Sequence, residues 1–174
     1  LHNPTDVYGK TKSLGEVGGA HVTHLRYTIA GPEIGPGRSL LAWFLRQDAV
    51  KGYTHHRCNG GTTLSFAKLC GGIIESGLVL PHKLHVLPED VVTKCEVLQC
   101  FSDYYRAGQV VVEAAAPGLA VDRTLKTRHP ASNVELWRAA GYSEVPRIRQ
   151  LYAEMAAYRN DFQQSIISRV AASR

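Results

Sequence analysis

No apolar run in this 174-residue sequence approaches the roughly 18 residues that a membrane-spanning helix needs. The first residues, Leu1 to Pro4, have neither the basic segment nor the apolar segment of a signal peptide. Hydrophobic residues make up 44% and charged residues 20% of the chain, a balance typical of globular proteins rather than disordered ones. We therefore expect a cytoplasmic protein with no membrane partner, folded as one domain or as one domain with part of another.

Patterns for disulfides and metal sites are missing too. The four cysteines contain no Cys-x-x-Cys pair, which favours reduced and buried thiols. Three pairs of histidines lie close together, but their spacings match no zinc pattern and no acidic residue lies beside them. These pairs are His21/His24, His55/His56 and His82/His85. Because neighbours on a strand point to opposite faces, we expect His55 and His56 to be separated, and we predict no metal site.

The basic residues form no block. The formal net charge is +5, but the lysines and arginines are scattered, and no aromatic residues interleave with them as a base-stacking platform requires. We therefore expect no nucleic-acid partner. Scattered arginines suit small anions better, because a guanidinium group binds phosphate as a two-pronged donor.

What the chain does contain is a tyrosine and a lysine, Tyr8 and Lys12, four residues apart near its start. The residues from Ser13 to Val17 favour a helix, and helical spacing would place both side chains on one face, within reach of each other. A phenol beside an ammonium group can donate and accept a proton, because the positive charge favours the phenolate. Ordinary surface pairs with a half-buried tyrosine show the same spacing.

A predicted strand from Val22 to Ala30 ends at Gly31-Pro32, and further glycines and prolines follow as far as Gly37. In open α/β sheets ligands bind at the carboxyl ends of strands, so this loop is a candidate binding segment. A plain surface connection would have the same residues. Gly35-Pro36-Gly37-Arg38 lacks the spacing of a dinucleotide-binding fingerprint.

The rest of the sequence alternates between helical and strand patterns. Predicted helices run over 40–46 after Ser39, over 63–75 between a cap at Thr62 or Thr63 and a stop at Gly77, over 93–105 from a capping box, from a cap at Asn133 to Gly141, and from Pro146 onward with Ile148, Leu151, Tyr152, Met155 and Tyr158 on one face. Predicted strands lie within 51–59, 83–87 and 109–115, and 117–130 is expected to be irregular. The tail beyond Phe162 stays compatible with a helix. This alternation predicts a mixed α/β fold in one compact piece.

The tyrosine and lysine belong to a longer string, Asn3-Pro4-x-x-x-Tyr8-Gly9-x-Thr11-Lys12, followed by Gly15-Glu16. It resembles the active-site helix of the extended short-chain dehydrogenases/reductases, the family of sugar-nucleotide reductases and epimerases. Later features follow in the same order as in that family: the Gly31-Pro32 loop, Gly60-Gly61-Thr62-Thr63-Leu64 before a helix, and Asp122-Arg123-Thr124-Leu125. Residues from roughly 3 to 158 are therefore similar to the C-terminal half of a sugar-nucleotide reductase, close to the dTDP-4-dehydrorhamnose reductase group.

The resemblance implies an α/β fold class: the last elements of a doubly wound, Rossmann-type sheet plus a small mixed α/β substrate-binding domain. Residues 1–35 would be the remnant of the NAD(P)-binding domain, and 36–174 mainly the substrate-binding domain with late return elements. The half with the Gly-rich phosphate turn is absent, as is the serine or threonine that usually precedes the tyrosine. We therefore expect on the order of 100 further residues ahead of Leu1 in the parent protein.

The resemblance also implies roles for individual residues. Tyr8 would donate a proton to the substrate while NADPH or NADH delivers hydride, and Lys12 would hold the nicotinamide ribose. Gly31 and Pro32 would lie near the nicotinamide. A nucleotide-sugar substrate would be bound by three residues, which are Arg57, Asn59 and Arg123.

Three readings of function stay open at this point. In the first reading, the chain is a truncated part of an NAD(P)-dependent reductase of a 4-keto-deoxysugar nucleotide. This chain alone would then bind the cofactor weakly or not at all, and the parent enzyme could be a homodimer. Alternatively the chain is a non-catalytic sugar-nucleotide-binding fragment. An epimerase or a dehydratase of the same superfamily is the third reading. A dehydratase needs an acid beside the tyrosine, and Asp6 is better explained as a helix cap.

Overall fold

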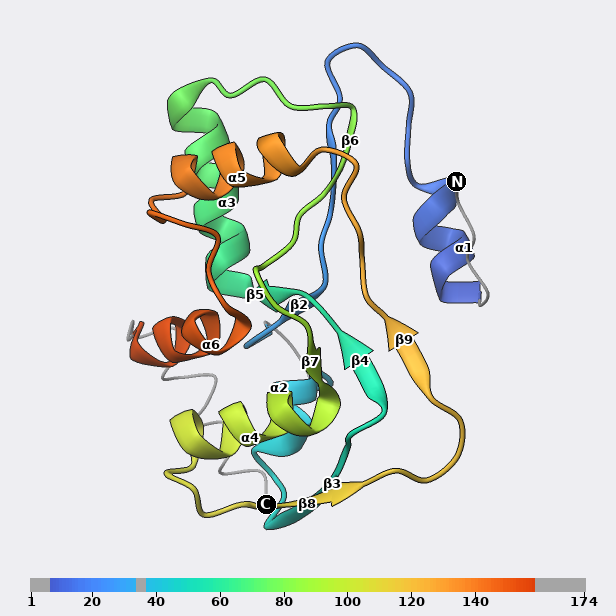
Figure 1. Ribbon diagram of the computed structural model, residues 1–174, viewed down its shortest axis with the longest axis vertical. Helices are drawn as coiled ribbons and strands as arrows, with labels where there is room; N and C mark the ends of the chain where they lie inside the picture. The colour runs from blue at the N-terminus through green and yellow to red at the C-terminus, as the bar shows by residue number, and fades with distance from the viewer. Residues whose placement is uncertain (1–6, 34–36, 159–174) are drawn as a thin grey trace.

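A computed structural model describes residues 7–33 and 37–158 of the chain (Figure 1). Helices and short strands alternate within these ranges, which confirms the mixed α/β class. The start of the tyrosine motif, with the cap predicted at Asp6, lies outside the described residues. So do the middle of the Gly/Pro loop and the helical tail predicted beyond Phe162.

The described residues contain six helices and nine short strands, which loops connect. The helices are α1 (Val7–Leu14), α2 (Leu40–Phe44), α3 (Thr63–Ser76), α4 (Lys94–Tyr105), α5 (Pro130–Ala139) and α6 (Ile148–Ala157). The strands are β1 (His24–Arg26), β2 (Ile29–Ala30), β3 (Ala49–Tyr53), β4 (His56–Cys58), β5 (Gly61–Thr62), β6 (Lys83–His85), β7 (Val92–Thr93), β8 (Val111–Ala115) and β9 (Val121–Arg123).

The predicted helix caps are formed as the sequence indicates. The side chain of Ser39 accepts a hydrogen bond from the backbone N–H of Ala42 at the start of α2. Thr62 begins α3 in a capping box, and Thr93 begins α4 in another. Gly77 ends α3 in the left-handed conformation, with φ of 63°.

Two predicted strands are each divided in the structure. The segment expected as one strand from Val22 to Ala30 forms β1 and β2, which pair with different partners, β6 and β5. Between them Tyr27 turns inward, where its hydroxyl lies 3.1 Å from Ser65 Oγ. The segment 51–59 likewise forms β3 and β4, separated by a turn that contains His55. The two histidine rings therefore touch, with centroids 4.5 Å apart, and the predicted separation of His55 and His56 is wrong.

Three other expectations need correction. The segment predicted to be irregular contains β9, which pairs with β4. Helix α5 begins at Pro130, so Asn133 lies within the helix and is not its cap. The Asn133 side chain is buried, and its amide forms hydrogen bonds with the backbone of Leu87. Helix α6 begins at Ile148, and Tyr158 at its end is half exposed rather than part of the packed face.

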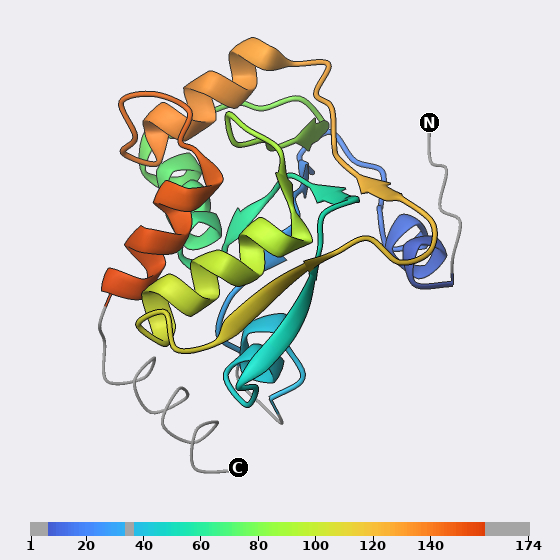
Figure 2. The same cartoon turned by 60° about the horizontal axis from the view of Figure 1, so that its bottom comes forward.

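The strands form four small sheets that are mostly parallel. β1 pairs with β6, β2 with β5 and β3 with β8, all in parallel. β4 lies between antiparallel β7 and parallel β9. Parallel pairing requires long crossover connections, and helices supply most of them here. Helices α4 and α6 lie side by side, as Figure 2 shows.

The buried core has two clusters with α6 between them. One gathers residues of α2, β3 and α4 around Phe44 and Phe101, and the other gathers residues of α3, β6 and α5 around Trp137. Helix α6 gives Ile148, Tyr152 and Met155 to the first and Leu151 to the second.

Helix α1 lies apart from this packed body (Figure 1). None of its residues is buried, and Val7 and Leu14 are exposed. The segment after α1 is attached through Glu16, whose carboxylate binds Arg26 of β1 and Lys83 of β6. None of the helices in the described ranges combines the length and the apolar character that crossing a membrane requires.

Candidate functional site

Two cavities share a wall in the middle of the molecule. The central cavity has a volume of about 740 Å³ and is lined by residues of β2, α2, β3, β4, α4, β9 and α6 and the loop after β2. The α1 cavity has a volume of about 1180 Å³ and lies between α1 and β1. Thr28, Ile29 and Arg123 line both cavities. A ligand in one cavity can therefore lie next to a ligand in the other.

The predicted pair lies in the α1 cavity. Tyr8 and Lys12 both line it, and the Lys12 Nζ lies 5.6 Å from the centre of the Tyr8 ring. This is the distance expected of side chains one helical turn apart. The Tyr8 side chain is 70% exposed, so its hydroxyl is open to a molecule that enters the cavity.

The wall opposite this pair carries a cluster of charges. The Glu16 carboxylate accepts hydrogen bonds from Arg26 at 2.6 and 2.8 Å, and Lys83 Nζ lies 2.9 Å from it. Hydrogen bonding from Arg26 is the main cause that lowers the pKa of Glu16 to about 2. Near neutral pH this carboxylate is ionised and paired. It is therefore not a proton donor for chemistry beside Tyr8.

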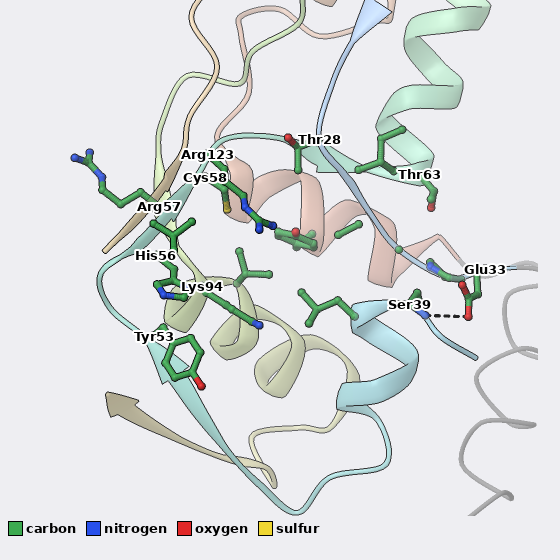
Figure 3. Close-up of a pocket in the computed structure, with 18 residues that line it drawn as sticks. Thr28, Glu33, Ser39, Tyr53, His56, Arg57, Cys58, Thr63, Lys94 and Arg123 are labelled. Carbon is green, nitrogen blue, oxygen red and sulfur yellow. Dashed lines mark hydrogen bonds between the residues drawn. The ribbon is translucent and has the colours of Figure 1, made fainter. Parts of the chain in front are cut away.

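The register of β4 and β9 decides which side chains face the central cavity. Cys58 lies opposite Arg123, and Arg57 lies opposite Asp122. Because side chains alternate along a strand, these two pairs are on opposite faces. Both arginines line the central cavity, but Figure 3 shows the Arg123 guanidinium pointing into it and the Arg57 side chain pointing away from it. Hydrogen bonding from Thr124, with a smaller contribution from the charge of Arg57, lowers the pKa of Asp122 on that outer face.

The central cavity also has a cationic and aromatic wall that the sequence did not indicate. Lys94, the first residue of α4, places its Nζ 5.7 Å from the centre of the Tyr53 ring, and the His56 ring centre is 4.7 Å from that ring. Burial, followed by the charge of His55, lowers the pKa of His56. His56 is therefore neutral near pH 7, and Lys94 and Arg123 supply the positive charge.

Gly31 and Pro32 line the central cavity at the carboxyl end of β2. The described start of the Gly/Pro loop, residues 31–33, is thus part of the cavity wall and not a plain surface connection. Gly31 is buried, and a side-chain carbon there would collide with the side chain of Thr63 and approach Met155 Sδ to 3.1 Å. Only a glycine lets the backbone pass this close to α3 and α6.

Asn59 lies outside both cavities and is only 4% exposed. Its amide nitrogen donates to the Leu125 carbonyl at 2.9 Å, and its amide oxygen accepts from the Leu125 N–H at 2.6 Å. Both ends of the amide are occupied, so Asn59 holds the segment that follows Arg123 rather than facing a ligand.

On the far side of the central cavity Glu33 provides a carboxylate. Its Oε1 accepts a hydrogen bond from the Ser39 N–H at 2.9 Å, as Figure 3 shows. The cavity is therefore acidic at this side and basic at the wall of Lys94. Within the described residues, no group of three histidine, cysteine or acidic side chains could hold a metal ion.

Three solved structures resemble this arrangement of elements. A dTDP-4-dehydrorhamnose reductase from Clostridium acetobutylicum superimposes with a TM-score of 0.63 at 14% identity, over 88% of this chain and 55% of that one. The enzyme of that name from Bacillus anthracis, solved in complex with NADP, gives 0.61 at 13% identity, over 88% and 56%. The enzyme from Yersinia enterocolitica gives 0.52 at 8%, over 76% and 47%.

The chain has the fold of these reductases. It spans about half the length of the solved structures it matches. No protein-family model and no curated protein matches the sequence. The likeness to dTDP-4-dehydrorhamnose reductases therefore lies in the arrangement of the chain, and it bears out the α/β architecture that the motif order predicts.

Proposed function

We propose that this chain is the substrate-binding part of an NAD(P)-dependent reductase that acts on a 4-keto-deoxysugar nucleotide. One observation carries the proposal: the tyrosine and lysine of the motif line a cavity that adjoins a second, cationic cavity through Thr28 and Arg123. A reductase needs such a pair of adjoining spaces, because hydride passes directly between the cofactor and the substrate carbon.

In this proposal the α1 cavity takes the nicotinamide end of NADP or NAD, and the central cavity takes the nucleotide sugar. When bound, the reduced nicotinamide supplies the hydride. The Tyr8 hydroxyl donates a proton to the developing alkoxide, and Lys12 holds the ribose and favours the phenolate. Arg123 faces the substrate in this proposal, whereas Gly31 and Pro32, expected near the nicotinamide, line the central cavity and do not line the α1 cavity.

The residues present fit only part of a dinucleotide. The wide α1 cavity and the exposed Tyr8 suit the nicotinamide end, but the sequence has no Gly-rich turn for the pyrophosphate. The proposal therefore assigns most cofactor binding to the remaining half of such an enzyme, with 1–35 as part of the cofactor domain and 36–174 mainly as the substrate domain. A cytoplasmic location belongs to the same proposal. The exposed Val7 and Leu14 of α1 would be covered by that half, or by a second copy in a homodimer.

A dehydratase on this scaffold is less well supported. Such an enzyme needs a free acid beside the tyrosine, and Glu16 is the acidic residue of the described ranges that lines the α1 cavity. Its carboxylate is bound by Arg26 and Lys83. An epimerase, or a fragment that binds sugar nucleotides without catalysis, uses the same central cavity and differs from the reductase in its reaction alone.

The test is NADPH oxidation by the product of the complete gene, with a 4-keto-deoxysugar nucleotide as substrate. Tyr8→Phe should lower kcat by about 10²–10⁴, because it removes the proton donor. Tyr158→Phe is the matched control, since Tyr158 is also exposed and lies at the end of α6, and it should leave kcat unchanged. An unchanged kcat in Tyr8→Phe, or no turnover with any such substrate, contradicts the proposal.

A further inference from the structure

The central cavity has three distinct parts along its length. Thr28 and Arg123 lie at the junction with the α1 cavity. Tyr53 lies at the opposite end in Figure 3, and Lys94 lies between these two ends. Tyr53, His56 and Lys94 line the central cavity and do not line the α1 cavity. The order from the junction is therefore arginine, lysine, aromatic ring.

The two cations of this row have no acidic partner. In the described ranges, neither Lys94 nor Arg123 forms an ion pair with a carboxylate, whereas Glu16, Asp103 and Glu154 each hold a basic side chain elsewhere. Two cations that face one cavity without a carboxylate partner raise its affinity for an anion, because their attractions for the anion add.

The aromatic end is built from rings that contact one another at tilted angles, between 58° and 64°. The rings of Tyr53, His55 and His56 contact one another, with centroid distances from 4.5 to 5.9 Å. Desolvation, followed by the charge of His55, lowers the pKa of His56, so this end offers ring surface more than positive charge. A flat aromatic ligand group gains stacking energy on such a surface.

We propose that the central cavity binds a nucleoside diphosphate in one direction, with the base against Tyr53 and His56 and the phosphates at Lys94 and Arg123. The group attached to the second phosphate then lies at Thr28, next to the α1 cavity. This last placement rests on the proposed function, whereas the nucleotide site itself does not. A volume of about 740 Å³ is sufficient for a nucleotide and part of a sugar.

The Glu33 carboxylate disfavours a ligand placed across the cavity, with its phosphates on the side away from Lys94. Glu33 lines the cavity away from the wall of Lys94, so phosphates moved toward it would meet a like charge. A sugar with hydroxyl groups is compatible with that carboxylate as a hydrogen-bond acceptor.

The experiment compares UDP, dTDP and inorganic pyrophosphate by calorimetry on this chain, without cofactor. The nucleotides should bind about 5- to 100-fold more tightly than pyrophosphate, because only they stack on the rings. Tyr53→Ala should remove most of that difference and leave pyrophosphate binding unchanged, while Tyr53→Phe retains it. Lys94→Gln and Arg123→Gln should each weaken nucleotides and pyrophosphate alike, by about tenfold or more.

Arg57→Gln is the matched control for Arg123→Gln. Arg57 is exposed, and although it lines the cavity its side chain points away, so this variant removes the same charge from the partner strand and should change the affinity less than about twofold. Circular dichroism establishes that each variant is folded. Equal affinity for pyrophosphate and nucleotides, equal losses in Arg57→Gln and Arg123→Gln, or no binding of either nucleotide would overturn the site.

The outcome is separable from that of the proposed function. Nucleotide binding with this pattern of variants, but without NADPH oxidation by the complete enzyme, retains the site and rejects the reductase. If the complete enzyme turns over its substrate, but the Tyr53 and Lys94 variants bind nucleotide as tightly as the unchanged protein, the reductase is retained and the nucleotide site is rejected.

Discussion

His56 is the titratable side chain whose charge should matter most to an anion in the central cavity. Its ring contacts Tyr53 and His55, and the positive charges of Lys94 and Arg123 act on it from α4 and β9. Burial and these neighbours lower its pKa below the ordinary value of 6.5. The unfolded chain therefore takes up this proton first as the pH falls, and His56 reduces the free energy of unfolding on acidification.

A bound diphosphate reverses this preference, because it favours the protonated ring. We predict that UDP binds about three- to tenfold more tightly as the pH falls from about 7.5 to about 5.5, relative to the His56→Gln variant. Titration of the phosphate affects UDP binding to both proteins equally, so it does not affect the ratio of their affinities. Calorimetry across this pH range measures it, with His129→Gln at the exposed start of α5 as the control. A pH-independent ratio contradicts an electrostatic influence of the His56 charge on the diphosphate bound at Lys94.

Which residues face a ligand could be predicted only where local spacing decides it. Tyr8 and Lys12 share a helix, so their proximity follows from the sequence. Residue type alone predicts that Arg57, Asn59 and Arg123 bind a ligand, but of these only the Arg123 side chain points into the central cavity. The directions of Arg57 and Asn59 depend on the turn that divides the strand and on the Leu125 backbone, which lies far away in the sequence. Lys94 and Tyr53 could not be predicted from the sequence, because only tertiary packing brings them together.

At the scale of elements, two neighbouring glycines of α3 show how closely it packs on α5. A side-chain carbon at Gly72 would lie 2.5 Å from the carbonyl of Ala139, in the backbone of α5. One at Gly71 would meet no atom within 4 Å. Packing therefore requires glycine at position 72, whereas glycine at position 71 only lowers the stability of the helix.

Alanine at these two positions should have opposite effects on stability. Gly72→Ala should lower the free energy of unfolding by about 1–3 kcal/mol, because α5 must move away. Gly71→Ala should raise it by about 0.5–1 kcal/mol, because alanine favours the helix. Urea unfolding followed by circular dichroism measures both changes. If the two variants shift in the same direction, the close contact between α3 and α5 is wrong.

The helices were easier to predict than the strands for a related reason. Caps such as Thr62 and Thr93 act within four residues, so the chain itself carries the information. The strands here have two to five residues, and each is defined by a partner distant in sequence. A period of two cannot be recognised in so few residues, and β9 was therefore missed.

For the whole molecule, α6 is the element that makes one structure of two core clusters. Leu151 is fully buried in the cluster around Trp137, while Ile148, Tyr152 and Met155 are buried in the other. The chain also passes between the clusters several times, since α2 and α4 belong to the cluster around Phe101, whereas α3, which lies between them in sequence, and α5 belong to the cluster around Trp137. A division of the chain near residue 35 does not separate these cores.

We therefore predict that both clusters unfold together, and that shortening a buried side chain of α6 destabilises both. Leu151→Ala should lower the free energy of unfolding by about 2–5 kcal/mol, and Ile74→Ala, at an exposed position of α3, by less than about 0.5 kcal/mol. In a Trp43→Phe background, the fluorescence of Trp137 reports the cluster of α3 and α5. Hydrogen exchange of α4 reports the other cluster. The two probes should give one midpoint and the same shift in Leu151→Ala, because a helix shared by both cores couples their unfolding. Separate midpoints, or a shift confined to Trp137, would show that the two clusters are independent units.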